Sequence, residues 1–245
     1  MNAQRTSTAG APALADASLP FSVRLVGNEE DLYKAVRVRH ATYARLTPEL
    51  ADKLKYPEAA DTENGVVVLL AESKQDGTPL GSVRIQSNQF RPLHLEQSVA
   101  LPGWLKALRL VEASRFGVTD LALGTLVETV MFKACYLYCK MASVDWIVVA
   151  GRTPIDAQYE QLLFEDIVPD LGYIPLQHAG NLPHRIMSLN VATVRDRWQA
   201  AKHPLFDFHF RTHHPDIDIT GPAHADSSPI KRTAFPPRTP GDSKL

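Results

Sequence analysis

The chain has 245 residues, which is long enough for one sizeable domain around a single core. Hydrophobic residues make up 44% of it and charged residues 22%, as is typical of globular proteins, and the formal net charge of −1 gives no global attraction to nucleic acid or anionic membranes. No apolar run approaches the roughly 18 residues that a transmembrane helix needs. We therefore expect no nucleic-acid partner and no integral membrane segment.

The two ends of the chain differ in composition from its middle. Residues 1–19 lack the apolar segment of a signal peptide, so we expect a disordered leader. Residues 203–245 are rich in Pro, Ser, Thr, Asp and Gly, which favours a disordered tail because little apolar surface is available for burial. Residues 20–202 remain as the folded domain. Cys135 and Cys139 fall on one predicted helix, and we expect reduced thiols in a cytoplasmic protein.

Predicted strands and helices alternate along the domain. Asn28 is a candidate N-cap for the first helix, and Asp76-Gly77 predicts a hairpin turn. Hairpins come first and helical crossovers later, which predicts an α/β (α+β) fold with a mixed sheet flanked by helices. In chain order, the elements are a strand at Phe21–Val26, a helix from Asn28 to about Leu46, strands at Gly65–Glu72, Leu80–Ser87 and Arg109–Val118, a helix at Leu121–Met141, a strand at Trp146–Ala150, a helix starting near Pro154, strands at Tyr173–Gln177 and Arg185–Val191, and a helix at Ala192–Ala201.

The first predicted helix carries an arginine within its apolar stripe. At 100° per residue, Arg39 falls among the apolar side chains, whereas Arg37 points away from them. Burying a guanidinium costs several kcal/mol unless carboxylates pair with it. Arg39 is therefore part of a structural ion pair or of a functional site. The stripe consists of Leu32, Val36, Arg39, Tyr43 and Leu46, all within about 40° of one direction.

Further charged residues lie on neighbouring predicted elements. Glu58 and Asp61 precede the second strand, and Arg84 lies in the middle of the third. Glu112 and Arg115 interrupt the fourth strand, where they would face opposite sides unless a β-bulge lies between them. These residues form either a functional cluster or a network that only rigidifies the fold.

Several short motifs, in this order, resemble a known family. They are Arg39 with Tyr43 four positions later, Glu58-x-x-Asp61, G-S-V-R at Gly81–Arg84 and E-A-S-R-F at Glu112–Phe116. Residues 21–195 resemble the acyl-homoserine-lactone synthases and the long-chain N-acyl amino acid synthases, a branch of the GCN5-related N-acyltransferase superfamily. The resemblance implies a splayed mixed sheet, acyl transfer, and a site that contains Arg39, Tyr43, Glu58, Asp61, Arg84, Glu112, Ser114, Arg115 and Phe116.

The sequence departs from the lactone synthases at two points. Glu58 stands where those enzymes usually have aspartate. The first helix also lacks the tryptophan that they usually carry beyond Tyr43, and this second departure favours the amino acid synthases within the branch. Our leading hypothesis is therefore transfer of a long acyl chain from acyl carrier protein to the amine of an amino acid. The alternatives are an acyl-homoserine-lactone synthase that uses S-adenosylmethionine, or a non-catalytic acyl-binding or regulatory module of the same fold.

Aminolysis of a thioester requires a neutral amine, a stabilised oxyanion and a departing thiolate. A bulge in Val111–Val118 would free a backbone N–H for the oxyanion, and such donors are worth about a few kcal/mol. Glu112 is the candidate general base, and the resemblance adds Arg115 as a second catalytic residue. We expect no metal and no cofactor beyond the acyl-phosphopantetheine thioester of the donor, because two helical cysteines without a nearby histidine make a poor zinc site.

The donor prediction depends on the loop before the second long helix. Coenzyme A enzymes of this fold usually carry a Q/R-x-x-G-x-G/A loop whose N–H groups bind the pyrophosphate. From Gly117 to Gly124 the glycines are not at that spacing, and Asp120 adds a negative charge, so we expect acyl carrier protein. Lys133, Lys140 and Arg152 form a candidate basic patch for this acidic carrier, or ordinary solvated surface.

The histidines give weaker signals. His178 and His184 flank the last predicted hairpin, in a substrate-binding loop or a plain turn. The histidines near the tail are expected to be solvated. They are His203, His209, His213 and His214.

Overall fold

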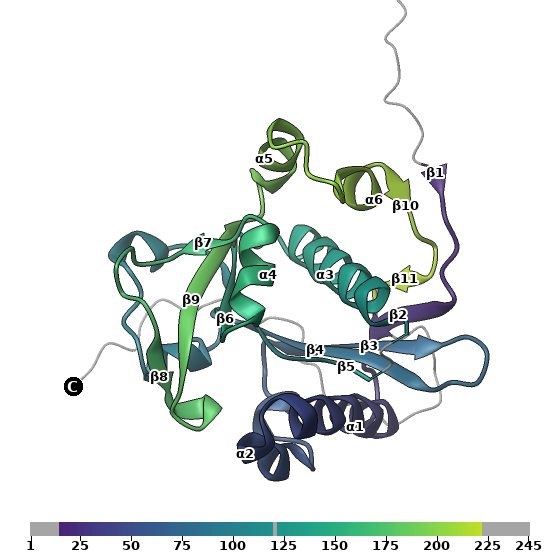
Figure 1. Ribbon diagram of the computed structural model, residues 1–245, viewed down its shortest axis with the longest axis horizontal. Coiled ribbons are helices and arrows are strands. Elements are labelled where there is room, and N and C mark those ends of the chain that lie inside the picture. Colours follow the sequence, from purple (N-terminus) through teal and green to yellow (C-terminus); the bar gives the residue numbers. More distant parts are fainter. Residues whose placement is uncertain (1–14, 120–121, 222–245) are drawn as a thin grey trace, which may run out of the picture.

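The computed structural model describes residues 15–119 and 122–221, which form a mixed sheet with helices on both faces (Figure 1). The α/β fold expected from the sequence is confirmed. The strands are β1 Ala15–Asp16, β2 Phe21–Leu25, β3 Val66–Ser73, β4 Pro79–Ser87, β5 Leu110–Val118, β6 Trp146–Gly151, β7 Glu165–Asp166, β8 Ile174–Leu176, β9 Leu182–Asn190, β10 Thr212–His213 and β11 Ile217–Asp218. The α-helices are α1 Glu29–Leu46, α2 Pro48–Ala51, α3 Gly124–Met141, α4 Ile155–Gln161, α5 Val194–Ala200 and α6 Phe206–Phe210.

The main sheet has the strand order β11-β2-β3-β4-β5-β6-β9-β7, and β8 pairs with β9 off this path. Its central neighbours are antiparallel except for β5 and β6, which run parallel and are connected through α3. A parallel pair needs such a crossover, whereas the antiparallel pair β3–β4 closes through the short turn at Gly77. No helix of the described ranges is both long and apolar enough to cross a bilayer.

Helix α1 begins where the sequence predicted it. The Asn28 side chain accepts the backbone N–H of Asp31 at 2.8 Å, which satisfies one of the free donors of the first turn. The apolar stripe packs on the sheet through Leu32 and Val36. Leu46, expected in the same stripe, is the last helical residue and is 62% exposed.

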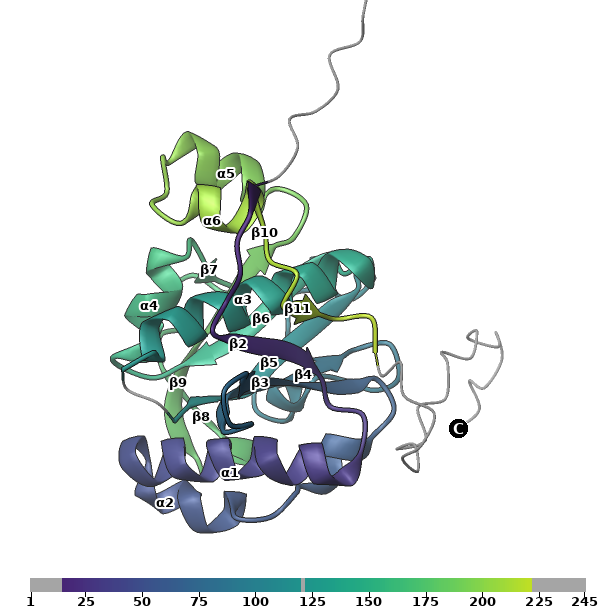
Figure 2. The same ribbon diagram turned by 90° about the vertical axis from the view of Figure 1, so that its right-hand side faces the viewer.

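Helices α1 and α3 lie on opposite faces of the sheet (Figure 2). Glycines let each approach closely, because a Cβ at Gly117 of β5 would lie 2.8 Å from the Oγ1 atom of Thr42 on α1. A Cβ at Gly81 of β4 would lie 2.6 Å from a methyl group of Val127 on α3. The main hydrophobic core fills the α3 side, and the α1 side holds a smaller cluster together with polar residues.

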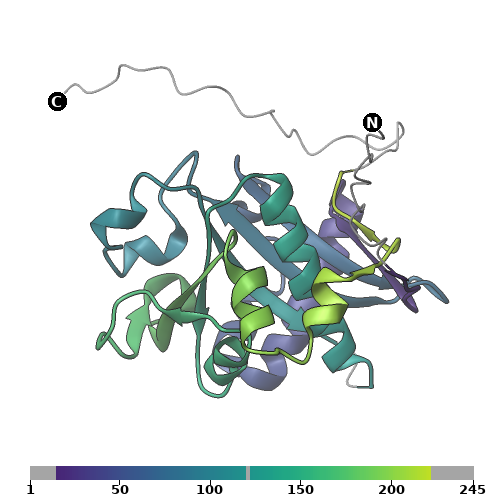
Figure 3. The same cartoon turned by 90° about the horizontal axis from the view of Figure 1, so that it is seen from above.

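The prediction that the domain ends at residue 202 and is followed by a disordered tail is wrong for residues 203–221, here called the C-terminal segment. This segment forms α6, β10 and β11, and returns to pair with β1 and β2 (Figures 1 and 3). The sequence F-D-F-H-F at 206–210 supplies aromatic rings that pack on Trp198, a feature that the average composition of the tail concealed. His209 and His214, expected in solvent, are buried. The expected disordered leader is likewise wrong for residues 15–19, which contain β1 and the buried Leu19. Residues 1–14 and 222–245 lie outside the described residues.

Lys133 on α3 fixes the C-terminal segment and is therefore not the surface cation that the sequence suggested. Its side chain is buried, and Nζ donates to the backbone oxygens of Phe208 at 2.8 Å and Thr212 at 2.5 Å. The third partner is Nδ1 of His214 at 2.8 Å. Burial lowers the pKa of the Lys133 amine to about 8. Three acceptors nevertheless offset the cost of placing the amine in the interior.

Replacing Lys133 should loosen the C-terminal segment. Lys133→Met keeps the aliphatic stem but leaves two carbonyls and one imidazole nitrogen without a donor, so we expect a loss of about 1–3 kcal/mol in unfolding free energy. Amide exchange of residues 206–218 should accelerate. Lys140→Met, at an exposed site of the same helix, is the matched control and should stay within about 0.5 kcal/mol of wild type. Equal stability and exchange in the two variants would contradict this role.

Candidate functional site

A β-bulge in β5 places the site. Between the pairs Ser82–Gly117 and Arg84–Ser114, β4 has one residue and β5 has two, so β5 contains one extra residue. Arg115 takes a φ of 54°, a left-handed conformation that non-glycine residues seldom adopt. The sequence left open whether β5 contains a bulge; the structure has one, and it lies at Arg115 itself and not between Glu112 and Arg115. Arg115 thereby joins Ser114 on the α1 face, whereas Phe116 turns to the α3 face.

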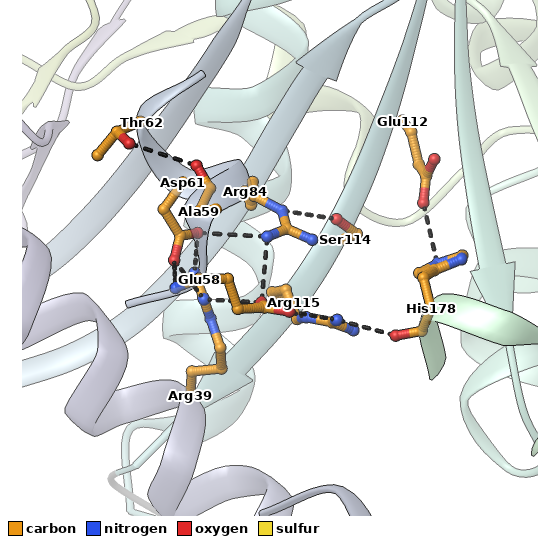
Figure 4. A network of polar contacts seen from close by, with 10 residues as sticks. All are labelled: Arg39, Glu58, Ala59, Asp61, Thr62, Arg84, Glu112, Ser114, Arg115 and His178. Atoms are coloured by element: carbon orange, nitrogen blue, oxygen red, sulfur yellow. Dashed lines mark hydrogen bonds and ion pairs between the residues drawn. The ribbon is translucent and has the colours of Figure 1, made fainter. Parts of the chain in front are cut away.

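Three arginines from three elements converge on two carboxylates next to this bulge (Figure 4). Arg39 of α1 binds Asp61 through two parallel hydrogen bonds of 2.9 Å. Arg84 of β4 contacts Glu58 at 3.1 Å, and its Nε lies 3.4 Å from Ser114 Oγ. Arg115 binds the same Glu58 through two bonds of 2.7 and 2.8 Å. These residues, which we call the arginine cluster, are Arg39, Glu58, Asp61, Arg84 and Arg115.

The arginine cluster is buried and carries excess positive charge. The side chains of Arg39 and Asp61 are fully buried, and that of Glu58 is 25% exposed. Burial raises the pKa of Glu58, but the hydrogen bond from Arg115 and the charges of the three arginines outweigh it and lower the pKa to about 2. Three guanidinium groups facing two carboxylates leave one positive charge uncompensated within the cluster.

The short 3₁₀ helix Ala59–Thr62 holds both carboxylates in position. The Glu58 backbone N–H donates to Asp61 Oδ2 at 2.8 Å, so Asp61 caps its own helix while it binds Arg39. Burial alone would lower the pKa of Arg115, but the hydrogen bond and charge of Glu58 keep it raised. Tyr43, one turn beyond Arg39, lies near the same arginine. The sequence motifs around Arg39, Tyr43, Glu58, Asp61 and Arg84 therefore meet in one place.

Glu112 belongs to a different group from the arginine cluster. Its Oε2 accepts the backbone N–H of Leu95 at 3.0 Å, and its Oε1 lies 3.4 Å from Nε2 of His178. His178 connects the two groups, since its backbone oxygen accepts a 3.0 Å hydrogen bond from Arg115 (Figure 4). The sequence singled out His178 only as a residue of the last loop. Nothing in its local pattern indicated a partner on β5, 66 positions away.

The α3 face of β5 borders a cavity of about 580 Å³. Among the described residues, the β5–β6 ladder ends at the pair Ala113–Val149, and both residues line the cavity. The strands separate there, as expected from the sequence for a splayed sheet. The walls are mainly apolar and come from the sheet, α3, α4 and the start of the C-terminal segment, including Phe116, Met131, Phe132, Cys135, Tyr159 and Leu205.

The basic patch expected on the surface is only partly present. Lys140 is exposed, but Lys133 faces the interior, and Arg152 is half-buried with a 3.3 Å contact to Thr47. Asp120 lies outside the described residues. Cys135 and Cys139 are free and buried, as expected for core positions. No group of three or more His, Cys, Asp or Glu side chains within residues 15–119 and 122–221 is placed to hold a metal ion.

Arg39 should be essential for stability. Arg39→Ala leaves Asp61 buried without its main partner, which should lower the free energy of unfolding by about 3 kcal/mol or more. Arg39→Lys should also destabilise the protein, because an ammonium group cannot form the two parallel bonds. Denaturant unfolding measures both effects. Arg37→Ala, at an exposed position of the same helix, is the control, and a wild-type midpoint in both Arg39 variants would refute the interpretation.

The lowered pKa of Glu58 predicts acid sensitivity. The folded state favours ionised Glu58, so its contribution is present above the ordinary glutamate pKa of about 4.5 and is lost as the pH falls toward 2. The loss should reach at most about 3–4 kcal/mol, because the pKa falls from 4.5 to about 2 and one pKa unit corresponds to about 1.4 kcal/mol. Unfolding free energies across this range should fall less steeply in Glu58→Gln than in wild type or in the exposed control Glu49→Gln. Parallel curves for all three proteins would exclude Glu58 as the source.

No protein-family model matches the chain, and no curated protein sequence matches it. Solved structures are similar to it, among them FeeM, an N-acyl amino acid synthase from uncultured soil microbes, with a TM-score of 0.57 and 18% identity over 74% of this chain and 96% of that chain. BjaI, a coenzyme A-dependent acyl-homoserine lactone synthase in complex with SAM and isopentyl-CoA, gives a TM-score of 0.54 and 15% identity over 82% of this chain and 94% of that chain. The chain therefore has the fold of the acyl-homoserine-lactone and N-acyl amino acid synthases, the branch that the sequence motifs predicted.

Proposed function

We propose that this protein is an N-acyltransferase that moves a long acyl chain from a thioester to the amine of an amino acid. One observation carries the proposal: β5 separates an apolar cavity on its α3 face from a charged site on its α1 face, at the point where it parts from β6. Acyl transfer from a long chain to a polar acceptor requires these two environments to meet at one carbonyl carbon. The folds of FeeM and BjaI support the same reaction class.

The cavity suits the acyl chain of the donor. Its volume of about 580 Å³ lies within the range of about 300–1,000 Å³ typical of small-molecule sites. Beyond Ala113, β5 has no ladder partner on its β6 side among the described residues, so backbone N–H groups near Ser114 are available to a thioester carbonyl. Fixed donors of this kind stabilise the oxyanion by about a few kcal/mol.

The arginine cluster suits an acceptor that carries a carboxylate. Its one uncompensated positive charge attracts an anionic group, and amino acids offer such a group next to the reacting amine. The acceptor in the lactone synthase alternative, S-adenosylmethionine, carries a carboxylate too, so the cluster by itself does not separate the two acceptors. The absence of the tryptophan beyond Tyr43 favours the plain amino acid.

For the donor we propose acyl carrier protein. The glycine spacing from Gly117 to Gly124 does not match the coenzyme A loop, and a carrier-bound phosphopantetheine brings one phosphodiester instead of a pyrophosphate and a further phosphate. With Lys133 buried, the candidate basic patch for an acidic carrier reduces to Lys140 and the half-buried Arg152. Coenzyme A as donor, as in BjaI, is the competing possibility.

Mass spectrometry of reaction products tests the proposal. Purified full-length protein is supplied with acyl carrier protein or coenzyme A thioesters of a range of chain lengths, together with mixed amino acids or S-adenosylmethionine. We expect N-acyl amino acids, with a higher kcat/KM for the carrier-protein donor. Ala113→Phe, which narrows the cavity, should shift the products toward shorter chains.

Each other outcome identifies what is wrong. An acyl-homoserine lactone would contradict the acceptor. A coenzyme A thioester used as well as the matching carrier-protein thioester would contradict the donor. Lack of any product from every donor and acceptor would favour a non-catalytic acyl-binding module, for which saturable binding of a fluorescent fatty acyl probe to wild type but not to Ala113→Phe is the corresponding measurement.

A further inference from the structure

We propose that His178 is the group that takes the proton from the incoming ammonium, and that Glu112 acts through His178 as a positioning residue. This inference rests on the proposed function. It changes the role that the sequence suggested for Glu112, from general base to the partner that orients and charges the base.

Burial separates the two candidates. The side chain of Glu112 is 1% exposed, with one oxygen bound to the Leu95 N–H and the other facing the imidazole of His178. The side chain of His178 retains 11% exposure. An incoming amine therefore meets the imidazole ring before the carboxylate. Nδ1 of the ring is buried, so the amine reaches this atom only when the ring or a neighbouring side chain shifts.

The backbone at His178 is held from two directions. Residue 178 lies in the short 3₁₀ helix Gln177–Ala179, whose backbone is fixed where Gln177 N–H donates to Ser98 Oγ at 2.9 Å. The backbone oxygen of His178 is bound by Arg115, so the arginine cluster also sets the position of this helix. These contacts fix the point from which the imidazole extends toward Glu112.

The contact with Glu112 assigns the tautomer. Nε2 lies 3.4 Å from Glu112 Oε1, an ion-pair contact without hydrogen-bond geometry, and Oε1 has no hydrogen-bond partner among the described residues. A proton on Nε2 would complete this contact, which leaves a free lone pair on Nδ1. Nδ1 is buried and has no hydrogen-bond partner among the described residues, which is an uncommon state for a buried polar atom. An ammonium group or a bridging water would satisfy it. A carboxylate on the far nitrogen is the arrangement that stabilises a histidine as it becomes charged.

The pKa of Glu112 supports the same assignment. Burial raises this pKa, but the contact with His178 and the hydrogen bond from the Leu95 N–H outweigh it, so the pKa is lowered from its ordinary value. Such a carboxylate is a weak base at neutral pH.

The proposed step balances as follows. Nδ1 of His178 takes one proton from the ammonium, and the imidazolium is stabilised by the Glu112 carboxylate. The neutral amine nitrogen attacks the thioester carbon, the C–N bond forms, and the C–S bond breaks with its electron pair on sulfur. The second proton lost from nitrogen goes to the thiolate, and the imidazolium releases its proton to solvent. The products are one amide, one thiol and one proton.

Charged and titratable groups surround His178 on every side. They are Glu112 and Arg115 on β5, His94 in the 3₁₀ helix His94–Gln97, and His184 on β9. The His94 ring lies 6.0 Å from that of His178, and burial together with the charge of Arg84 lowers its pKa. Burial lowers the pKa of His184 to about 4, so His184 stays neutral across the pH range in which the proton transfer would occur.

The test is the pH dependence of kcat/KM for N-acyl product formation. In wild type, kcat/KM should fall toward acidic pH in the range where imidazole becomes protonated, about pH 5 to 8, and we call this fall the acidic limb. His178→Gln, which keeps a hydrogen-bonding amide beside Glu112, should lose this limb and about 10²–10⁴ of the rate. Glu112→Gln should keep the limb but shift it to lower pH, because the imidazolium loses its carboxylate partner. His94→Gln, the neighbouring histidine without a hydrogen bond to Glu112, should keep the limb in place.

A second measurement does not depend on turnover. The His178 imidazole is titrated by NMR in the full-length protein, and its pKa should fall in Glu112→Gln and stay unchanged in His94→Gln. If wild type makes product while His178→Gln keeps both rate and limb, the proton transfer is overturned and the proposed function stands. Loss of the limb in His94→Gln instead would transfer the role to His94. If wild type makes no product, the proposed function and the proton transfer both fail, and an unshifted His178 pKa in Glu112→Gln overturns the pairing itself.

Discussion

The single extra residue in β5 determines how the two faces of the sheet are used. Without it, the alternation of side chains along the strand would carry Arg115 to the α3 face and Phe116 to the α1 face. The bulge places the guanidinium beside Glu58 and the phenyl ring in the cavity wall. It also places Gly117 against Thr42 of α1. Because Gly117 has no side chain, α1 lies close enough to the sheet for Arg39 to reach the same carboxylates. The left-handed backbone at Arg115 costs about 1–3 kcal/mol, which the surrounding contacts must offset.

The arginine cluster is a costly way to hold three elements together. A buried ion pair is weak support for stability by itself, because removing charges from water costs as much as their attraction returns. Apolar side chains of similar volume would pack α1 against the sheet without that penalty. What the cluster provides is a defined position for Arg115, and through it for the backbone of His178. The desolvation cost of the arginine cluster is therefore best explained by the site that the cluster builds. The rigidity of the surrounding elements is a consequence of that site.

The sequence predicted the parts of the fold that local rules govern. Asn28 before an acidic first turn, Asp76-Gly77 between two β-rich runs, and Arg39 within an apolar stripe each encode their structure over a few positions, and each was correct. The motifs that resemble the known family identified the residues of the arginine cluster, because these motifs follow one another in a fixed order and spacing along the chain. Burial of Lys133 was missed, since its three acceptors lie more than 70 positions away.

The same limit applies to Glu112 and His178. A glutamate within the strand and a histidine in a loop each have ordinary local surroundings, and only the packing of the last hairpin against β5 brings them together. The C-terminal segment was missed for another reason. Its prolines dominated the average composition, whereas the rings of His209 and Phe210 pack on Trp198 and Phe206 packs on Phe210.

Helix α3 links the cavity to the C-terminal segment. One side of the helix gives Met131 and Cys135 to the cavity wall, and Lys133 between them holds the carbonyls of Phe208 and Thr212. The same segment closes part of the cavity with Leu205, at the start of the stretch that Lys133 anchors. The shape of the cavity therefore depends on the anchoring of residues 206–214, far from the residues where the acyl group would react. A change in the C-terminal segment would alter which acyl chain fits while leaving Glu58, Arg115 and His178 in place.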